Sequence, residues 1–180
     1  MNPLEEMFWL GMKREVFTPL DLNDVSTQYD LERKPLILNL GAGTSIIEGT
    51  TPLDLPAWDA DVDVIPYEDG KVDCIHAYHL LEHVDRPEAL LWECHRVLRR
   101  GGLMNIVVPY GNGHLACQDM THRHFFNEDS WKTLFSNPFY NPMARGLEPC
   151  WWTFEVMTNV IMGVKGTNLA LLTQLMKTGV

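Results

Sequence analysis

A short apolar run that ends in a glycine pair constrains the fold of this chain more than any other feature. Residues 35–40 are apolar except for Asn39, and Gly41, Ala42 and Gly43 follow directly. Such a run is typical of a strand buried on both faces of a parallel sheet. Glycines placed after the strand let the backbone turn sharply and let a ligand approach it closely. We therefore predict an α/β fold with a ligand site at the carboxyl ends of its strands.

The rest of the chain alternates strand and helix patterns, as such a fold requires. Further strands are expected at 52–55, 62–65, 72–77, 103–108 and 152–164, and helices at 4–12, at 87–98 and after Asn127. Residues 169–177 fit either a strand or a helix. Because the 180 residues contain no repeat and no long linker, we expect one domain. Its parts would be an N-terminal helix and connection (1–30), a cofactor-binding core (35–109), and a substrate loop with C-terminal strands (110–180).

The composition excludes several classes of protein. Hydrophobic residues make up 46% of the chain, enough for a globular core. A formal net charge of -10 makes nucleic acid an improbable partner, since that binding depends on Lys and Arg. No apolar run approaches the roughly 20 residues of a membrane span. The four cysteines are widely spaced and contain no C-x-x-C pair, so the sequence indicates neither a zinc ribbon nor a disulfide framework. We expect a cytoplasmic protein with no membrane partner.

Asp54 follows the second expected strand and extends the predicted ligand site. An acidic residue at this place accepts hydrogen bonds from ribose hydroxyls in nucleotide-binding sheets. Only 13 positions separate it from Gly41, against about 20 in the usual dinucleotide pattern. We therefore expect the first helix to be shortened or absent. Its loss would remove helix N-terminal N–H groups that help to hold a cofactor, which leaves weak cofactor affinity open.

Three ordered blocks resemble the Methyltransferase type 11 group of class I S-adenosylmethionine-dependent methyltransferases. They are residues 65–84, residues 96–103 with the sequence R-V-L-R-R-G-G-L, and residues 121–125 with the sequence T-H-R-H-F. Three blocks in order are far more specific than one glycine motif. The resemblance covers roughly residues 35–135. It implies a Rossmann-like sheet of seven strands, mostly parallel with an antiparallel C-terminal strand, in a compact three-layer sandwich.

The resemblance also implies S-adenosylmethionine as the cofactor and assigns residues to it. The residues expected at the cofactor are Leu40, Gly41, Ala42, Gly43, Asp54, Asp61 and Ala77. Within this set, residues 40–43 would lie near the methionine part, Asp54 at the ribose and Asp61 near the adenine. The segment between Asp54 and Pro66 is shorter than usual, so Asp63 is an alternative to Asp61. Trp58 fits either stacking on the adenine or ordinary packing.

Histidines near the expected site are candidates for proton removal. Methyl transfer is an in-line displacement at a sulfonium carbon, so a hydroxyl nucleophile must be positioned and must lose its proton. A histidine suits this task because its pKa lies near neutrality. His79 is placed at the methyl-transfer pocket by the resemblance, and His122 belongs to a long loop between residues 110 and 126. We expect His79 or His122 to act as the base, with Asp119 orienting one of them.

The H-x-x-E-H sequence at residues 79–83 also has metal-ligand chemistry. Some related methyltransferases place E-x-x-E-H here and use a metal, and some of these add a histidine from the later loop. The corresponding set in this chain is His79, Glu82, His83 and His122. Histidine in place of the first glutamate favours a transition metal over magnesium. Two alternatives stay open. In the first, Glu82 and His83 only brace the following helix. In the second, H-x-x-E-H is a zinc-protease signature, although its flanks here fit a strand that enters a loop.

We expect an enzyme that methylates an oxygen or nitrogen of a small molecule or glycan, the commoner targets among similar sequences. The alternative is a non-catalytic methyltransferase-fold protein that binds a partner. The apolar N-terminal helix and the region of Trp151 and Trp152 are the candidate surfaces for a protein partner or a homodimer. The sequence does not identify the methyl acceptor.

Overall fold

The computed structural model describes residues 34–136, 154–164 and 166–178. The chain divides into two units, residues 1–34 and 35–180, and the account below concerns the second. The predicted helix at 4–12 and the pair Trp151 and Trp152 lie outside the described residues, so the expected single domain and the expected partner surfaces stay predictions. In the described part, no helix combines the length and apolarity that a membrane crossing needs.

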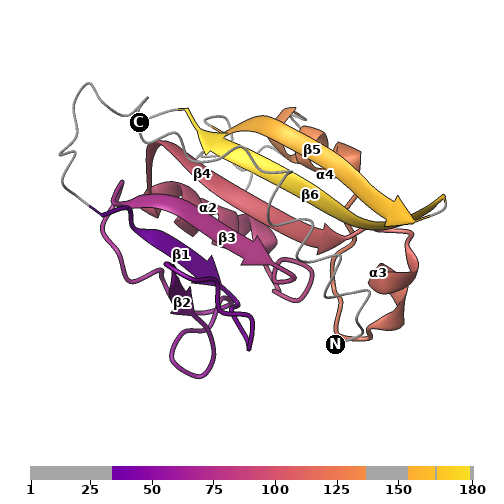
Figure 1. The fold of residues 1–180 in the computed structure, drawn as a ribbon, viewed down its shortest axis with the longest axis horizontal. Helices are drawn as coiled ribbons and strands as arrows, with labels where there is room; N and C mark the ends of the chain where they lie inside the picture. Colours follow the sequence, from indigo (N-terminus) through magenta and orange to yellow (C-terminus); the bar gives the residue numbers. More distant parts are fainter. Residues whose placement is uncertain (1–33, 137–153, 165, 179–180) are drawn as a thin grey trace. The chain divides into compact units, whose positions relative to one another are not determined.

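The described strands form one mixed sheet, with the order β2-β1-β3-β4-β6-β5 (Figure 1). Their bounds are β1 Ile37–Leu40, β2 Thr51–Leu53, β3 Val72–Tyr78, β4 Leu98–Pro109, β5 Phe154–Val164 and β6 Thr167–Lys177. Strands β2, β1, β3 and β4 pair in parallel, whereas β6 runs antiparallel to both of its neighbours. The predicted α/β sheet with an antiparallel C-terminal strand is therefore confirmed. Residues 169–177, which fitted either a strand or a helix, belong to a strand between β4 and β5.

The expected strand at 62–65 does not form, so the described part of the chain has six sheet strands where seven were predicted. The amides of Val62 and Asp63 donate to the carbonyl of Asp59, and the amide of Ile65 donates to Glu93 Oε2 at 3.1 Å. These backbone groups are thus satisfied by a turn and by a side chain. Val62 and Val64 are exposed, so a pattern that looked like a half-buried strand belongs to a surface loop.

The connection between β1 and β2 confirms the prediction of a missing first helix. Residues 41–50 form turns and irregular structure and contain no helix. The strand β1 is buried from Leu38 to Leu40, as expected for a strand with neighbours on both sides. The chain therefore reaches Asp54 by a short surface connection.

Three helices lie in the described residues: α2 Pro87–Val97, α3 His114–Gln118 and α4 Glu128–Ser136. Figure 1 shows α2 and α4 behind the same face of the sheet, and α3 beyond the end of β4. The helix α2 buries an apolar stripe of Leu90, Leu91, Cys94 and Val97. The helix expected after Asn127 is confirmed as α4, and Asn127 caps it by accepting the amide of Asp129 at 3.1 Å. This helix layer and the sheet are two of the three expected layers.

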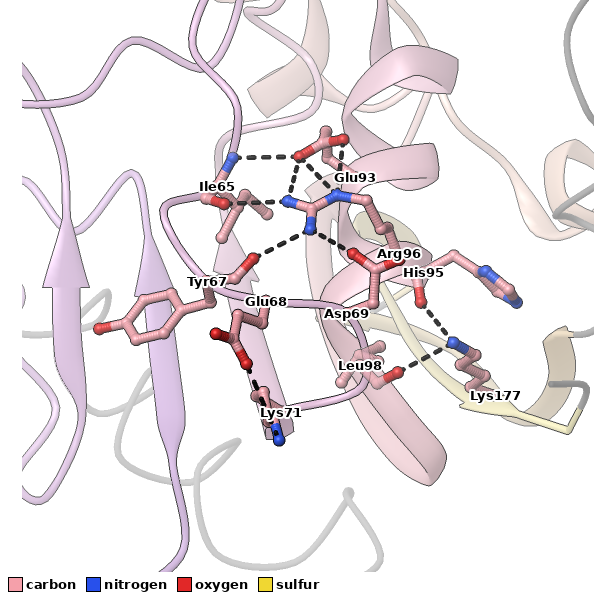
Figure 2. A network of polar contacts seen from close by, with 10 residues as sticks. All are labelled: Ile65, Tyr67, Glu68, Asp69, Lys71, Glu93, His95, Arg96, Leu98 and Lys177. Carbon is pink, nitrogen blue, oxygen red and sulfur yellow. Dashed lines mark hydrogen bonds and ion pairs between the residues drawn. The ribbon is translucent and has the colours of Figure 1, made fainter.

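Arg96 ties the loop before β3 to the helix α2 (Figure 2). Its guanidinium donates to the carbonyls of Ile65 and Tyr67 at 3.0 and 2.9 Å and to Asp69 at 2.7 Å. Glu93, one turn earlier in the helix, accepts from Arg96 at 2.8 Å and from the amide of Ile65. The fork of five donors on one arginine can serve several acceptors at once. The segment between the expected adenine region and β3 is thereby fixed to the core.

Lys177 of β6 contacts the C-terminal end of α2. Lys177 Nζ donates to the carbonyls of His95 and Leu98 at 2.9 and 3.0 Å (Figure 2). A cation at this place satisfies carbonyls left over at a helix C-terminus and complements its dipole. His95 is itself buried, and burial together with the charge of Lys177 lowers the pKa of His95 to about 4.

Candidate functional site

The strands β1 and β3 are neighbours from which the chain departs in opposite directions, with β2 beyond β1 and β4 beyond β3. Ligands of open α/β sheets bind at such a point, outside the carboxyl ends of the strands. Leu40 and Ala77 are register partners at these ends. The loops that begin at residues 41 and 79 therefore start side by side at one edge of the sheet.

The glycine after β1 is required by its contact with the loop after β3. Gly41 has a φ of 62°, and a Cβ added to it would lie 2.9 Å from Cδ1 of Leu80. Left-handed backbone and close approach both demand glycine here. This contact brings the predicted cofactor loop directly against residues 79–83, which carry the H-x-x-E-H sequence.

Asp54 lies next to the same loop. Its Oδ2 accepts a 2.6 Å hydrogen bond from the backbone N–H of Gly43, another glycine with positive φ. Leu40, Ala42 and Ala77 are buried beside them, with exposed fractions of 4% or less. The structure thus brings the residues expected at the methionine and ribose parts of the cofactor to one edge, formed by β1, β2 and β3.

Asp61 and Asp63, the aspartates expected near the adenine, accept hydrogen bonds from backbone amides and so stabilise the loop after β2. Asp61 Oδ1 accepts the amide of Asp85 at 2.6 Å, which links this loop to the start of α2. Asp63 Oδ2 accepts the amide of Asp59 at 2.8 Å. Trp58 is 4% exposed within the hydrophobic core and donates from Nε1 to the carbonyl of Val64 at 3.2 Å. Of its two expected roles, the structure shows ordinary packing.

His79 begins the loop after β3 in an uncommon backbone conformation. Its φ is 56°, a left-handed value that costs free energy for a residue other than glycine and that is concentrated at functional sites. Its Nδ1 lies 3.0 Å from Oε1 of Glu82, whose side chain is 1% exposed. A carboxylate only accepts hydrogen bonds, so the pair places the Nδ1 proton of His79 on the side of Glu82.

The long loop between β4 and α4 is closed at its neck and attached to the loop after β3. Tyr110 and Phe126 form an isolated bridge, and the amide of Gly111 donates to the carbonyl of Phe126 at 2.7 Å. The amides of Arg123 and His124 both donate to the carbonyl of Glu82, at 2.7 and 3.2 Å. The sequence predicted this loop but not the short helix α3 within it. These contacts hold His122 close to residues 79–83, which carry the H-x-x-E-H sequence.

Three of the four residues in the predicted metal set meet at this junction. One ligand atom from each of Glu82, His83 and His122 lies within 4.8 Å of the others. The imidazole rings of His83 and His122 have centroids 4.7 Å apart, in an edge-to-face arrangement. His79 contacts the cluster through Glu82 instead of joining it. The described residues thus contain a cluster of two imidazoles and one buried carboxylate beside the predicted cofactor loop.

Asp119, expected to orient a catalytic histidine, is bound mainly to Thr121. Asp119 Oδ1 accepts from the hydroxyl and the amide of Thr121 at 2.7 and 2.8 Å, and these bonds lower the pKa of Asp119. Its Oδ2 lies 3.8 Å from Nε2 of His122, an ion-pair distance too long for a hydrogen bond. Thr121 itself contacts His83 Nδ1 at 3.0 Å. Sequence reasoning missed Thr121, although it opens the T-H-R-H-F block.

The sequence that forms this edge of the sheet matches a known protein family. Residues 40–106 match the family model described as a methyltransferase domain, and this segment contains Gly41, Asp54 and His79. Over these residues the chain is similar to methyltransferase domains. A 37.1 kDa uncharacterized protein in transposon TN4556 of Streptomyces fradiae is 42% identical over 59 residues. That match covers 31% of this chain and 17% of the Streptomyces protein, so the chain spans only a small part of that relative.

Solved structures share the fold of this chain. The cyclase SpnF gives a TM-score of 0.55 at 13% identity, over 86% of this chain and 80% of SpnF. An S-adenosylmethionine-dependent methyltransferase of Methanosarcina mazei gives 0.54 at 15% identity, over 81% and 94%. The 1,6-didemethyltoxoflavin-N1-methyltransferase of Burkholderia thailandensis gives 0.50 at 20% identity, over 83% and 73%. At these identities the likeness concerns the fold, which also serves a cyclase.

Proposed function

We propose that this domain transfers a methyl group from S-adenosylmethionine to an oxygen or nitrogen of a small molecule or glycan. The observation that carries the proposal is the meeting of the Gly41–Gly43 loop with Asp54 and with the loop of His79 at one edge of the sheet. The match of residues 40–106 to a methyltransferase domain supports it. The Burkholderia neighbour, solved with S-adenosylhomocysteine and 1,6-didemethyltoxoflavin, is an example of such chemistry on this fold. The net charge of -10 favours an acceptor other than nucleic acid.

In this proposal the cofactor lies across the ends of β1 and β2. Residues Leu40 to Gly43 hold its methionine part, and Ala77 borders it from β3. The Asp54 carboxylate accepts hydrogen bonds from the ribose hydroxyls, which compete with the Gly43 amide for its oxygens. The adenine lies near the loop of Asp61, which is fixed to α2 through the amide of Asp85.

His79 is the residue we propose to accept a proton from the methyl acceptor. Its Nδ1 proton is directed to Glu82, so the neutral imidazole carries its lone pair on Nε2. The left-handed backbone at His79 and the contact of Leu80 with Gly41 hold this ring in the loop next to the cofactor. His122 is the second candidate, and Asp119 would contribute through its negative charge at 3.8 Å.

We also propose that the protein works in the cytoplasm. Cys74 and Cys117 are free thiols in the described part of the chain, and Cys117 is exposed. Unpaired thiols of this kind persist where the surroundings are reducing. A redox-sensitive fluorescent fusion that reports an oxidising compartment would contradict this location.

Calorimetric titration of the protein with S-adenosylhomocysteine tests whether the protein binds its proposed cofactor, which the proposed activity requires. We expect one binding site per chain, and competition by S-adenosylmethionine. The short connection between β1 and β2 predicts modest affinity, since no helix N-terminus follows Gly43. Absence of any heat up to millimolar ligand would overturn the proposal and would favour a partner-binding role instead.

A further inference from the structure

We propose that Glu82, His83 and His122 bind a divalent ion of the first transition row. Two imidazoles and one carboxylate are a ligand set used by zinc and non-haem iron sites, whereas magnesium and calcium prefer oxygen ligands. Three protein ligands leave coordination positions open for water or for an oxygen of a substrate. The binding of this ion does not depend on the cofactor. Only its use in methyl transfer would rest on the proposed function.

The carboxylate of Glu82 shows the first sign of a ligand. Its side chain is 1% exposed, and Oε1 is occupied by His79. Its Oε2 is buried and has no hydrogen-bond partner in the part of the chain that the structure describes. A buried carboxylate oxygen without a partner costs free energy. A bound cation would supply the missing interaction.

The hydrogen bonds of His122 leave the correct nitrogen for a metal. Its Nδ1 lies 2.8 Å from the carbonyl oxygen of Ala116. A carbonyl oxygen can only accept, so the Nδ1 carries the proton and the Nε2 of the neutral ring carries the lone pair. Metal-ligating histidines commonly donate their other N–H to a backbone carbonyl in this way.

The same reasoning applies to His83, through a chain of two hydrogen bonds. The hydroxyl of Thr121 donates to Asp119 at 2.7 Å, since a carboxylate only accepts. Its oxygen therefore accepts from His83 Nδ1 at 3.0 Å, and Nε2 of His83 carries the lone pair. Asp119 and Thr121 thus form the outer support of one ligand, as Ala116 does for the other.

The loops that carry the three ligands are held together before any ion binds. The amides of Arg123 and His124 attach the His122 loop to the carbonyl of Glu82. The ligand atoms lie within 4.8 Å of one another, whereas an ion about 2.1 Å from each would separate them by about 3.4 Å. Binding would therefore draw the two partly exposed imidazoles toward the buried carboxylate.

Titration of chelator-treated protein with Co²⁺ alone tests this site. We expect one equivalent to bind, with the visible absorption of cobalt coordinated by nitrogen and oxygen, and Zn²⁺ to displace it and to raise Tm by mass action. Glu82→Gln, His83→Gln and His122→Gln should each weaken binding by more than about 10-fold. The matched control is His114→Gln, an exposed histidine of the same loop outside the cluster, which should bind as the unchanged protein does.

His79 is a positioning residue in this proposal, because it acts through Glu82. His79→Ala should weaken Co²⁺ binding by about 10-fold. His79→Asn should restore most of the affinity, since asparagine tolerates left-handed backbone and keeps a side-chain N–H donor. A merely structural role would instead show in the circular dichroism spectrum and Tm of both metal-free variants.

Two results would overturn the proposal: no Co²⁺ or Zn²⁺ binding by the folded protein at millimolar metal, or unchanged affinity in the three ligand variants. Because the titration contains no S-adenosylhomocysteine, its failure is separate from a failure of cofactor binding. If one ligand variant does not fold, the other two and the unchanged protein still decide the outcome.

Discussion

The backbone N–H of Gly43 donates a 2.6 Å hydrogen bond to Oδ2 of Asp54. This bond joins the loop after β1 to the residue that follows β2, across a connection with no helix. We predict that Asp54→Asn lowers the affinity for S-adenosylhomocysteine by about 10- to 100-fold, because charge-assisted hydrogen bonds contribute about 1.5–3 kcal/mol each. Calorimetry measures the change. Asp129→Asn, an exposed aspartate in the first turn of α4, is the control and should leave the affinity unchanged; equal affinity in both variants would remove Asp54 from the site.

The contact between Gly41 and Leu80 predicts a difference between two glycine substitutions. Both Gly41 and Gly43 have positive φ, so alanine at either position should cost about 1–2 kcal/mol of unfolding free energy. Only Gly41→Ala also meets a neighbour, at 2.9 Å from Leu80, whereas a Cβ at Gly43 meets nothing within 4 Å. Urea unfolding should show Gly41→Ala to be less stable than Gly43→Ala by about 1–3 kcal/mol. Adding Leu80→Ala to each variant should narrow this gap; a gap of the same size would disprove the steric cause.

The ion pair of Arg99 and Asp73 is expected to matter most when one partner is removed. Arg99 Nε lies 2.8 Å from Asp73 Oδ1, and both side chains are 6% exposed. Asp73→Ala would leave a buried guanidinium without its charge partner, and we expect a loss of about 3–5 kcal/mol in unfolding free energy. The variant with both Asp73→Ala and Arg99→Met should lose less than the two single losses added together. Additive losses in urea titrations would show that the two side chains do not interact.

His95 predicts a specific acid sensitivity of the fold. Its pKa lies near 4 in the folded protein and at 6.5 in the unfolded chain, because burial and Lys177 oppose its protonation. As the pH falls from 6.5 to about 4, the unfolded chain binds more protons, so His95 destabilises the fold in this window. Unfolding free energies of the unchanged protein and of His95→Leu, measured at several pH values, should diverge between these limits. Parallel curves would contradict a buried neutral imidazole, since both proteins share the same carboxyl groups.

Much of the sheet could be predicted because its strands are buried on both faces. The runs at 35–40, 72–77 and 103–108 consist mainly of apolar residues, and each became a strand of the parallel core. Residues 62–65 have the sequence V-D-V-I, which also fits a strand, yet three of their amides bond to Asp59 and Glu93. The local sequence around Ile65 does not indicate that its amide bonds to Glu93, 28 residues away. The wrong prediction of a strand at 62–65 therefore could not be avoided from sequence alone.

In the candidate site, the sequence predicted which strand ends meet but not every side-chain hydrogen bond. Gly43 and Asp54 were expected at one site because carboxyl ends of parallel strands share an edge, and in the structure the Gly43 amide donates to Asp54. The partner of Asp119 was not predictable, because two backbone contacts of the Glu82 carbonyl decide where its loop lies. In that position the Asp119 carboxylate accepts a hydrogen bond from Thr121, two residues further along the chain, and not from a histidine.

Those two backbone contacts at Glu82 also determine which parts of the loop are free to vary. The donors are the amides of residues 123 and 124, which every amino acid except proline provides. At residue 123 the side chain also contributes, through an ion pair of Arg123 with Asp85. A library that keeps Arg123 and randomises position 124 without proline should retain the geometry of the cluster, which makes position 124 an entry point for changing what the loop recognises.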